Sequence, residues 1–451
     1  MGDLTERERH GRSIVKKKTT QAKDAGRRKG ATPGTAAQPE LEFVRKRAVP
    51  VVPVVPVVPV VPVVPVAPAA PVARAAARAG AAKVPGRAPV GGPALVARIR
   101  TQASGIRQTI LKGDKPSLKF PLRSLQNVRY LPSAGFFELK GRLKERTLTV
   151  STVKTFAQTL KMMALSKELV ETDDIATKRE AYYVSKNWAD ARFTEQPESD
   201  AVMDDVEALF GVNREQLGFI PEEKGGEVAG RLVVIDRDRD TDEILRIDCT
   251  KFGSGAYSIP ISVERLGFET DAKFILCIET AGMFQRLVKH NYWKTADCIL
   301  VSLGGVPTRA CRRFVRRLAD EKKLPVYVFV DGDPYGFSNI YRTLKVGSGN
   351  AAHLNEFFCV PQASFLGITP QDIVDYELPT HPLKEVDVKR AKDALKNDPF
   401  ILHHKPWQQA LQQMIRMGVR AEQQALAKHG LNYVMEEYLP QKLKKTGAFL
   451  P

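Results

Sequence analysis

The chain has 451 residues, 43% hydrophobic and 27% charged, which is typical of a globular protein with two or three domains. Its formal net charge of +18 is concentrated at the start: residues 1–100 hold 19 Lys and Arg against 6 Asp and Glu, and the remainder holds 50 against 45. The charged N-terminus has no apolar core, which excludes a secretory signal. Prolines at every third position exclude the apolar segment 49–72 as a membrane span.

Residues 1–100 are predicted to form a disordered basic arm without a packed core. Within it, a proline stands at every third position from Pro50 to Pro71. Polyproline II has three residues per turn, so segment 49–72 is expected to form a stiff rod about 70 Å long. The surrounding basic residues favour contact with a polyanion, nucleic acid first, and a solubilising tail is the alternative.

Residues 101–265 begin with a helical pattern. Apolar side chains at helical spacing from Val150 onward predict one helix, and the stretch KREAYYVSKNW predicts the next. Thr172 or either aspartate that follows it is the candidate N-cap of that second helix. A third helix is expected to begin at Ser199 and end at Gly211.

Segment 231–249 then predicts two apolar strands around a charged turn. Helix, turn, helix and hairpin is the order of a winged-helix DNA-binding domain of the CAP-like, α+β kind. We therefore expect residues 101–265 to form such a domain.

Residues 266–451 predict an α/β domain with a helical C-terminal extension. The apolar runs KFILCIE, DCILVSL and PVYVFVD alternate with helical stretches at 281–290 and 307–320. Strands buried on both faces and joined by helices indicate a parallel sheet. The five cysteines include no C-x-x-C pair, so they are expected to be reduced core thiols in a cytoplasmic protein.

Three carboxylates follow the ends of these runs. Glu279 ends the first run, Asp331 ends the third, and Asp333 lies two residues later. Ligands of parallel sheets gather at the carboxyl ends of the strands, so the three side chains are expected to converge. Oxygen ligands without nearby Cys or His favour Mg²⁺, whereas an acidic turn is the alternative for D-G-D alone. Gly332 and Gly336 are expected to let the backbone turn sharply there.

A nucleophile is predicted in KREAYYVSKNW. On a helix, Arg179, Tyr183 and Lys186 lie on one stripe, while Tyr182 lies on a more apolar one. A phenol beside two cations suits attack on a phosphodiester, because the cations favour the phenolate and neutralise phosphate charge. By periodicity alone, both tyrosines could equally be core residues or stack on DNA.

A basic helix is predicted after the second apolar run. Its arginines recur at helical spacing and could form a track for the DNA backbone, with a solvated helix face as the alternative. They are Arg309, Arg312, Arg313, Arg316 and Arg317.

KREAYYVSKNW, ILCIE and VFVDGDPYG, in this order, resemble the family formed by the A subunit of DNA topoisomerase VI and the eukaryotic meiotic double-strand-break protein. The resemblance runs from about residue 115 to the C-terminus. It implies a Toprim domain in which Glu279, Asp331 and Asp333 bind Mg²⁺. The final Tyr of the Arg-acidic-x-aromatic-Tyr motif, Tyr183, would be the nucleophile, with Arg179 in the same motif.

The family also implies partners: double-stranded DNA, a second copy of the chain that brings Tyr183 of one protomer to the metal site of the other, and an ATPase B subunit. No G-x-x-x-x-G-K-[ST] loop occurs here, so ATP is expected to bind the B subunit of an A₂B₂ heterotetramer. The expected activity is ATP-dependent type II topoisomerase at the chromosome: a transient double-strand break through 5′-phosphotyrosyl links, duplex passage and resealing. A programmed break-forming enzyme and a non-catalytic DNA-binding scaffold are the alternatives.

Overall fold

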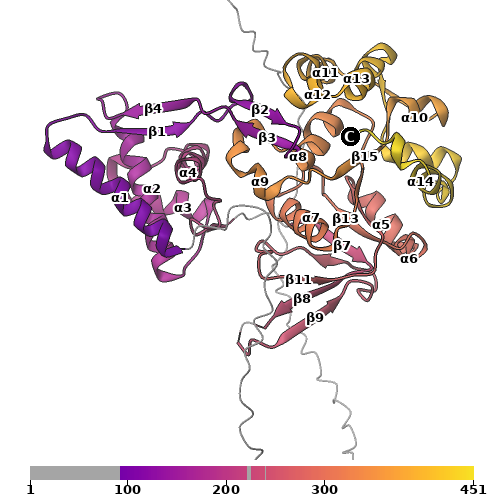
Figure 1. Cartoon of the computed structure of the whole chain (residues 1–451), viewed down its shortest axis with the longest axis horizontal. Helices are drawn as coiled ribbons and strands as arrows, with labels where there is room; N and C mark the ends of the chain where they lie inside the picture. Colours follow the sequence, from indigo (N-terminus) through magenta and orange to yellow (C-terminus); the bar gives the residue numbers. More distant parts are fainter. Residues whose placement is uncertain (1–91, 221–224, 239) are drawn as a thin grey trace, which may run out of the picture. The chain divides into compact units, whose positions relative to one another are not determined.

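The computed structural model describes residues 92–220, 225–238 and 240–451 (Figure 1). The predicted rod and most of the predicted arm lie outside these residues. The expectation that no core precedes residue 100 is wrong, because helix α1 (Gly92–Leu111) already buries Leu95 and Ile99. In the described ranges, no helix is both long and apolar enough to span a bilayer.

Helices dominate the part of the chain up to residue 220. Helix α2 packs against both α1 and α4, and their shared core includes Met162, Phe193 and Val206. The helices after α1 are α2 (Val153–Thr172), α3 (Lys178–Val184) and α4 (Gln196–Phe210). Short strand pairs accompany them: β1 (Ser117–Pro121) with β4 (Leu143–Thr147), β2 (Val128–Leu131) with β3 (Phe136–Leu139), and β5 (Ala176–Thr177) with β6 (Phe219–Ile220).

The ends of these helices test the predicted caps. Thr172 does not cap α3: it is the last residue of α2, which ends at Asp173 in the left-handed conformation. Thr177 caps α3 instead, in a reciprocal capping box with Glu180. The predicted end of α4 at Gly211 is confirmed, with φ +60°, although the helix begins before Ser199.

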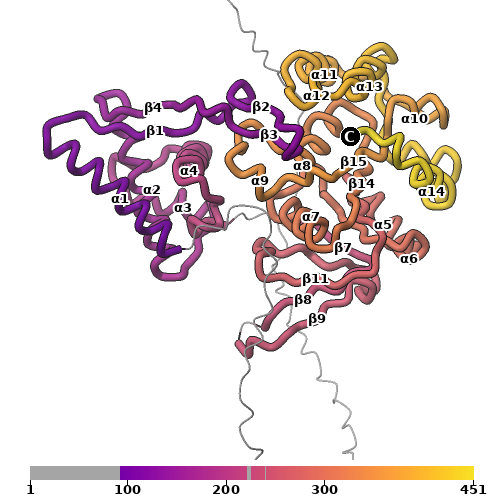
Figure 2. Tube along the Cα trace, viewed as in Figure 1, coloured from indigo at the N-terminus to yellow at the C-terminus, as the bar shows by residue number. Residues whose placement is uncertain are grey.

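The predicted hairpin at 231–249 is confirmed, but it is not the wing of the preceding helices. Strands β8 (Val233–Arg237) and β9 (Ile244–Asp248) pair antiparallel, and β11 (Gly267–Glu269) pairs with the other edge of β8. The backbone groups of β8 are therefore used within a separate three-stranded sheet, in the order β11-β8-β9. Figure 2 shows these three strands following one another side by side.

A six-stranded sheet forms the second part of the chain. Its order is β10-β7-β13-β12-β14-β15, and β13, β12, β14 and β15 run parallel, as predicted. Strands β7 and β10 come from before residue 266 and add an antiparallel edge. The bounds are β7 (Glu227–Gly230), β10 (Tyr257–Ser258), β12 (Phe274–Ile278), β13 (Cys298–Ser302), β14 (Val326–Phe329) and β15 (Ala363–Gly367).

Both faces of this sheet are buried. Along β12, Ile275 and Cys277 enter a core shared with α7 (Arg309–Lys322), whereas Leu276 and Ile278 enter another core shared with α5 (Ala281–Lys289). The strands therefore read as continuous apolar runs. The predicted helical stretches correspond to α5 and α7, and all five cysteines are free and buried.

The remaining elements cover the sheet and complete the C-terminal extension. They are α6 (Tyr292–Thr295), η4 (Gly336–Tyr341), α8 (Arg342–Lys345), η5 (Gly349–Leu354), α9 (Asn355–Phe358), α10 (Pro370–Asp375), β16 (His381–Pro382), α11 (Glu385–Asn397), α12 (Pro399–His403), α13 (Lys405–Met417), β17 (Val419–Arg420), η6 (Gln423–His429), η7 (Val434–Tyr438), α14 (Leu439–Leu443) and η8 (Thr446–Ala448). The described part of the chain before residue 220 also has three short 3₁₀ turns: η1 (Leu125–Asn127), η2 (Ser185–Asn187) and η3 (Ala189–Ala191).

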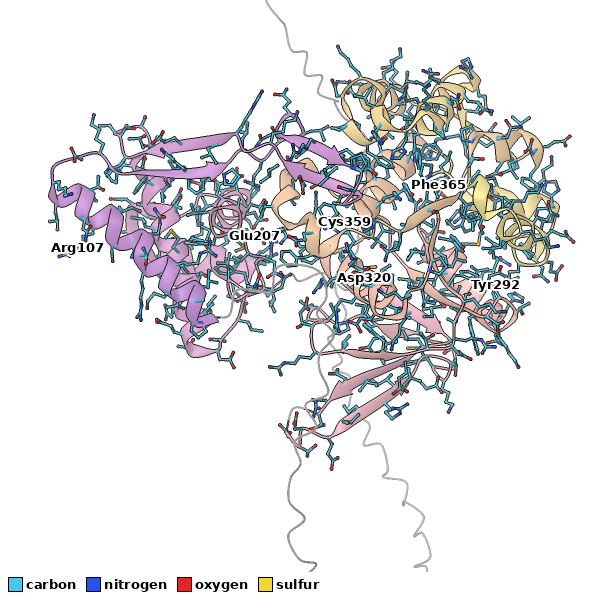
Figure 3. The ribbon with its side chains drawn as sticks, viewed as in Figure 1. Arg107, Glu207, Tyr292, Asp320, Cys359 and Phe365 are labelled. Carbon is cyan, nitrogen blue, oxygen red and sulfur yellow. The ribbon has the colours of Figure 1, made fainter. Side chains whose placement is uncertain are left out.

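A buried ion pair joins α4 to α7. Glu207, labelled in Figure 3, is fully buried and accepts hydrogen bonds from Arg309 at 2.5 and 3.0 Å. Burial alone would raise the pKa of Glu207, but the charges of Arg309 and Arg214 outweigh it, and the pKa is lowered. The pair therefore connects the helix that follows the tyrosine-bearing segment to the helix that covers the carboxylate-bearing sheet.

Removing Arg309 should destabilise the chain because Glu207 would remain buried with the weaker contact to Arg214, at 3.5 Å, as its nearest remaining ion pair among the described residues. We expect Arg309→Ala to lower the apparent free energy of unfolding by about 3 kcal/mol, measured by urea denaturation. Arg246→Ala, which removes an exposed pair with Glu269, is the matched control and should have little effect. Equal effects of the two variants would contradict this assignment.

Candidate active site

The sheet places Glu279 and Asp331 side by side. Strands β12 and β14 are direct neighbours, and the backbone N–H of Glu279 extends their ladder by donating to the Phe329 carbonyl at 3.0 Å. The backbone N–H of Asp331 donates to Glu279 Oε2 at 2.8 Å. The structure therefore confirms the prediction that these two residues converge at the carboxyl ends of neighbouring strands.

Each of the three carboxylates has one oxygen held by a backbone N–H. Glu279 Oε2 is held by Asp331, Asp331 Oδ1 by Gln423 at 2.8 Å, and Asp333 Oδ1 by Gly336 at 2.6 Å. Among the described residues, no hydrogen bond or ion pair reaches Glu279 Oε1 or Asp331 Oδ2. Asp333 Oδ2 faces the Arg420 guanidinium at 3.6 Å. The second oxygens of Glu279 and Asp331 are thus available to a cation.

The site carries more negative charge than its surroundings neutralise. Burial, and then the neighbouring Asp331 charge, raises the pKa of Glu279 to about 8. Burial likewise raises the pKa of Asp331 to about 6, against the hydrogen bond from Gln423, and raises the pKa of Asp333. A bound dication would supply the missing positive charge.

The residues fit Mg²⁺ by their chemistry, since they present several hard oxygen donors and an excess of negative charge. In the described part of the chain, no group of three or more His, Cys, Asp or Glu side chains already stands in a metal-binding arrangement. The fit therefore rests on the donor set and its charge and not on a finished coordination shell.

The two glycines of this loop are required by close packing. A Cβ on Gly336 would lie 2.6 Å from the Asp331 carbonyl oxygen, and one on Gly332 would lie 3.0 Å from Ile368. Neither glycine has a positive φ. The prediction that these glycines are needed for a sharp turn is therefore wrong. They are needed because neighbouring backbone and side-chain atoms lie too close to leave room for a Cβ.

Tyr183 lies on α3 with its side chain 55% exposed. The Arg179 guanidinium lies 5.9 Å from the centre of the Tyr183 ring, one helical turn away, as predicted. In the described part of the chain, the Tyr183 hydroxyl forms no hydrogen bond. An exposed, unbonded phenol beside a cation is free to meet an external phosphate.

Tyr182 differs from its neighbour in exposure and in hydrogen bonding. It is half-buried, its hydroxyl donates to the Thr194 carbonyl at 3.1 Å, and the Lys186 amine lies 4.0 Å from its ring centre. Lys186 also donates to the Phe193 carbonyl at 2.7 Å. The expectation that Lys186 accompanies Tyr183 is wrong, because α3 ends at Val184 and Lys186 follows in a 3₁₀ turn.

The predicted DNA track on α7 is not supported. Four of its arginines are paired inside the chain: Arg309 with Glu207, Arg313 with Glu264, Arg316 with Asp320 and Arg317 with Glu321. The fifth, Arg312, is only 9% exposed. Because they are buried or paired, these guanidiniums form neither a free row for phosphates nor a solvated face.

Three residues that lie near the carboxylates were not identified from the sequence: Arg420, Glu422 and Gln423. An antiparallel bridge between Gly332 and Ala421 brings their segment to the site. The Glu422 charge raises the pKa values of both Glu279 and Asp331. They lie almost ninety positions after Asp333, and no local spacing indicates that such a segment returns to the sheet edge.

Family models match three consecutive segments of the chain. Residues 154–219 match a model described as type IIB DNA topoisomerase, and residues 222–272 match an all-beta domain in the DNA topoisomerase VI alpha subunit. Residues 274–443 match the Toprim domain that Spo11 shares with the A subunit of topoisomerase 6. The second match covers the β11-β8-β9 sheet, in agreement with its separation from the preceding helices.

Curated relatives named as the A subunit of type 2 DNA topoisomerase 6 are similar along most of their length. The protein of Methanocaldococcus jannaschii is 56% identical over 349 residues, which is 77% of this chain and 94% of the relative. That of Methanothermobacter thermautotrophicus is 36% identical (77% and 97%), and that of Halobacterium salinarum is 39% identical (74% and 92%). With this similarity, the chain belongs to the family of topoisomerase VI A subunits and is the DNA-cleaving subunit of a type II DNA topoisomerase.

Proposed function

We propose that Tyr183 is the nucleophile of this protein and that Glu279, Asp331 and Asp333 hold Mg²⁺ beside the DNA. The observation that supports this most directly is the difference between the two tyrosines. Tyr182 is hydrogen-bonded and half-buried, while Tyr183 is exposed, unbonded and next to Arg179. Only the second can reach a phosphate without first breaking an internal hydrogen bond.

The proposed reaction is a reversible transesterification. The Tyr183 oxygen attacks a backbone phosphorus as its proton leaves to solvent or a nearby base, and the bond from phosphorus to the 3′-oxygen breaks while that oxygen takes up a proton from solvent. The product carries a 5′-phosphotyrosyl link and a free 3′-hydroxyl, which can attack in return and reseal the strand. Arg179 stabilises negative charge as it develops on the phosphate. The metal, once bound, would neutralise phosphate charge as a Lewis acid.

We propose that the cleavage centre is shared between two copies of the chain. In the described ranges, neither Tyr183 nor Arg179 forms a hydrogen bond or ion pair with any of the three carboxylates. A homodimer would bring the tyrosine of one protomer to the metal site of the other and place two such centres on the two strands of a duplex. Duplex passage would follow between the paired breaks.

The same proposal needs an energy source outside this chain. We propose an ATPase B subunit in an A₂B₂ assembly that relaxes supercoils and decatenates DNA at the chromosome, with the helical part of the chain before residue 220 binding the duplex. The curated relatives are named as topoisomerase subunits, which favours this over a programmed break-forming enzyme. Residues 1–91, which carry most of the net positive charge, are proposed to hold DNA non-specifically.

Tyr183→Phe should abolish the covalent protein–DNA adduct, because it removes the attacking oxygen and leaves the ring. DNA binding, measured by fluorescence anisotropy, should be unchanged. Tyr182→Phe is the matched control, and it should keep adduct formation within a few-fold because its oxygen faces Thr194. The assignment fails if Tyr182→Phe loses the adduct in denaturing gels while Tyr183→Phe keeps it.

Glu279→Gln should lower Mg²⁺-dependent cleavage about 100-fold or more, because it removes a charged oxygen donor from the metal site. The metal-free variant should nevertheless melt at a higher temperature than the wild type at neutral pH, because burying the Glu279 carboxyl, whose pKa is raised to about 8, costs free energy that a neutral amide does not. Glu436→Gln, at an exposed carboxylate, is the control and should change neither quantity. Cleavage that persists at the full rate in EDTA would refute the metal site.

A further inference from the structure

Gln423, although distant in sequence, is bound to the carboxylate site through its backbone and through both ends of its side-chain amide. It is fully buried and begins η6, directly after the segment that bridges to Gly332. Its backbone N–H donates to Asp331 Oδ1, and both ends of its side-chain amide are also bonded. A buried amide is costly unless its groups are satisfied, so these bonds define one orientation of the side chain.

The amide joins the ends of the two strands that bear the carboxylates. Gln423 Nε2 donates to the Phe329 carbonyl, at the end of β14, at 2.7 Å. Gln423 Oε1 accepts from the Thr280 hydroxyl, one residue after Glu279, at 2.8 Å. The Phe329 carbonyl also accepts from the backbone N–H of Glu279 at 3.0 Å, so both of its lone pairs are used.

A flipped amide would not serve. It would place the side-chain oxygen against the Phe329 carbonyl oxygen, where two acceptors repel. The bonds on both sides thus fix which end of the amide faces each strand. The side chain therefore acts as a strut of defined length between the ends of β12 and β14.

We propose that Gln423 is a positioning residue of the metal centre: its side chain sets the spacing between Glu279 and Asp331 at which both can bind one cation. This inference rests on the proposed metal site. Unlike those of Arg420 and Glu422 in the same segment, the Gln423 side chain carries no charge, so its removal with the backbone N–H kept changes the geometry of the site rather than its net charge. Substituting a residue that holds metal ligands in place typically lowers metal affinity about 10- to 100-fold.

The test is Gln423→Met, which removes both side-chain hydrogen bonds at similar volume and keeps the backbone N–H to Asp331. The full-length chain, without DNA, is titrated with Mn²⁺ and with Mg²⁺, and the metal-induced shift of its melting temperature is measured. Half-saturation should move to about 10-fold higher metal concentration or more. With the B subunit present, the Mg²⁺ needed for half-maximal cleavage should rise similarly, while cleavage at saturating Mg²⁺ recovers.

Two further variants sharpen the test. Gln424→Met makes the same change at the exposed neighbouring side chain and should leave metal affinity unchanged. Thr280→Val removes the other end of the same connection, so it should weaken metal binding in the same direction and add little to Gln423→Met in the double variant. Thr280→Val also provides the measurement if Gln423→Met does not fold.

The possible results separate the two proposals. A wild-type chain that binds metal, with variants that bind it equally well but cleave more slowly at every Mg²⁺ concentration, would overturn the positioning role alone. A wild-type chain whose melting temperature responds to neither metal would overturn the metal site, and the role of Gln423 with it.

Discussion

Uncompensated negative charge at the carboxyl ends of the inner strands β12 and β14 is the constraint around which the site is arranged. Direct pairing of β12 with β14 forces Glu279 and Asp331 together, and the backbone hydrogen bonds of the loops use one oxygen of each. Burial then makes the remaining charge costly, as the raised pKa values show. Such an arrangement is unfavourable for the chain alone and would become favourable with the proposed dication, so the proposed metal site implies that stability is sacrificed for function here.

The helix that bears Tyr183 has to expose its functional side chain, whereas the sheet buries its carboxylates. A nucleophile for DNA, as we propose Tyr183 to be, must be exposed, yet α3 has only seven residues and little intrinsic stability. The capping box of Thr177 and Glu180, the buried Ala181 and the hydrogen bond of Tyr182 hold it in place. Tyr183 is left free as a result, while its neighbour stabilises the helix. The Glu207–Arg309 pair then connects α4 to the sheet domain that carries the carboxylates.

The sequence was sufficient wherever function depends on local pattern. Apolar runs predicted the parallel sheet and the position of Glu279 and Asp331 at its edge, and motif resemblance predicted the family. Prediction from the sequence failed where tertiary contacts determine the position and the partners of a side chain. Lys186 leaves the helical stripe because α3 ends early, and Arg309 and Arg313 of α7 are paired by carboxylates from distant parts of the chain. Gln423 reaches the site through a bridge between segments nearly ninety residues apart, which no periodicity can reveal.

The central claim is that Tyr183 of one protomer and the carboxylates of its partner form one cleavage centre. Differently tagged chains can be co-purified as mixed dimers, one bearing Tyr183→Phe and the other Glu279→Gln, and assayed with the B subunit on supercoiled DNA. A shared centre leaves one of the two sites intact, so these dimers should nick one strand, whereas dimers of wild type with the double variant should not cleave. Nicking only by the second kind of dimer would contradict the account, because it would place both groups in the same chain.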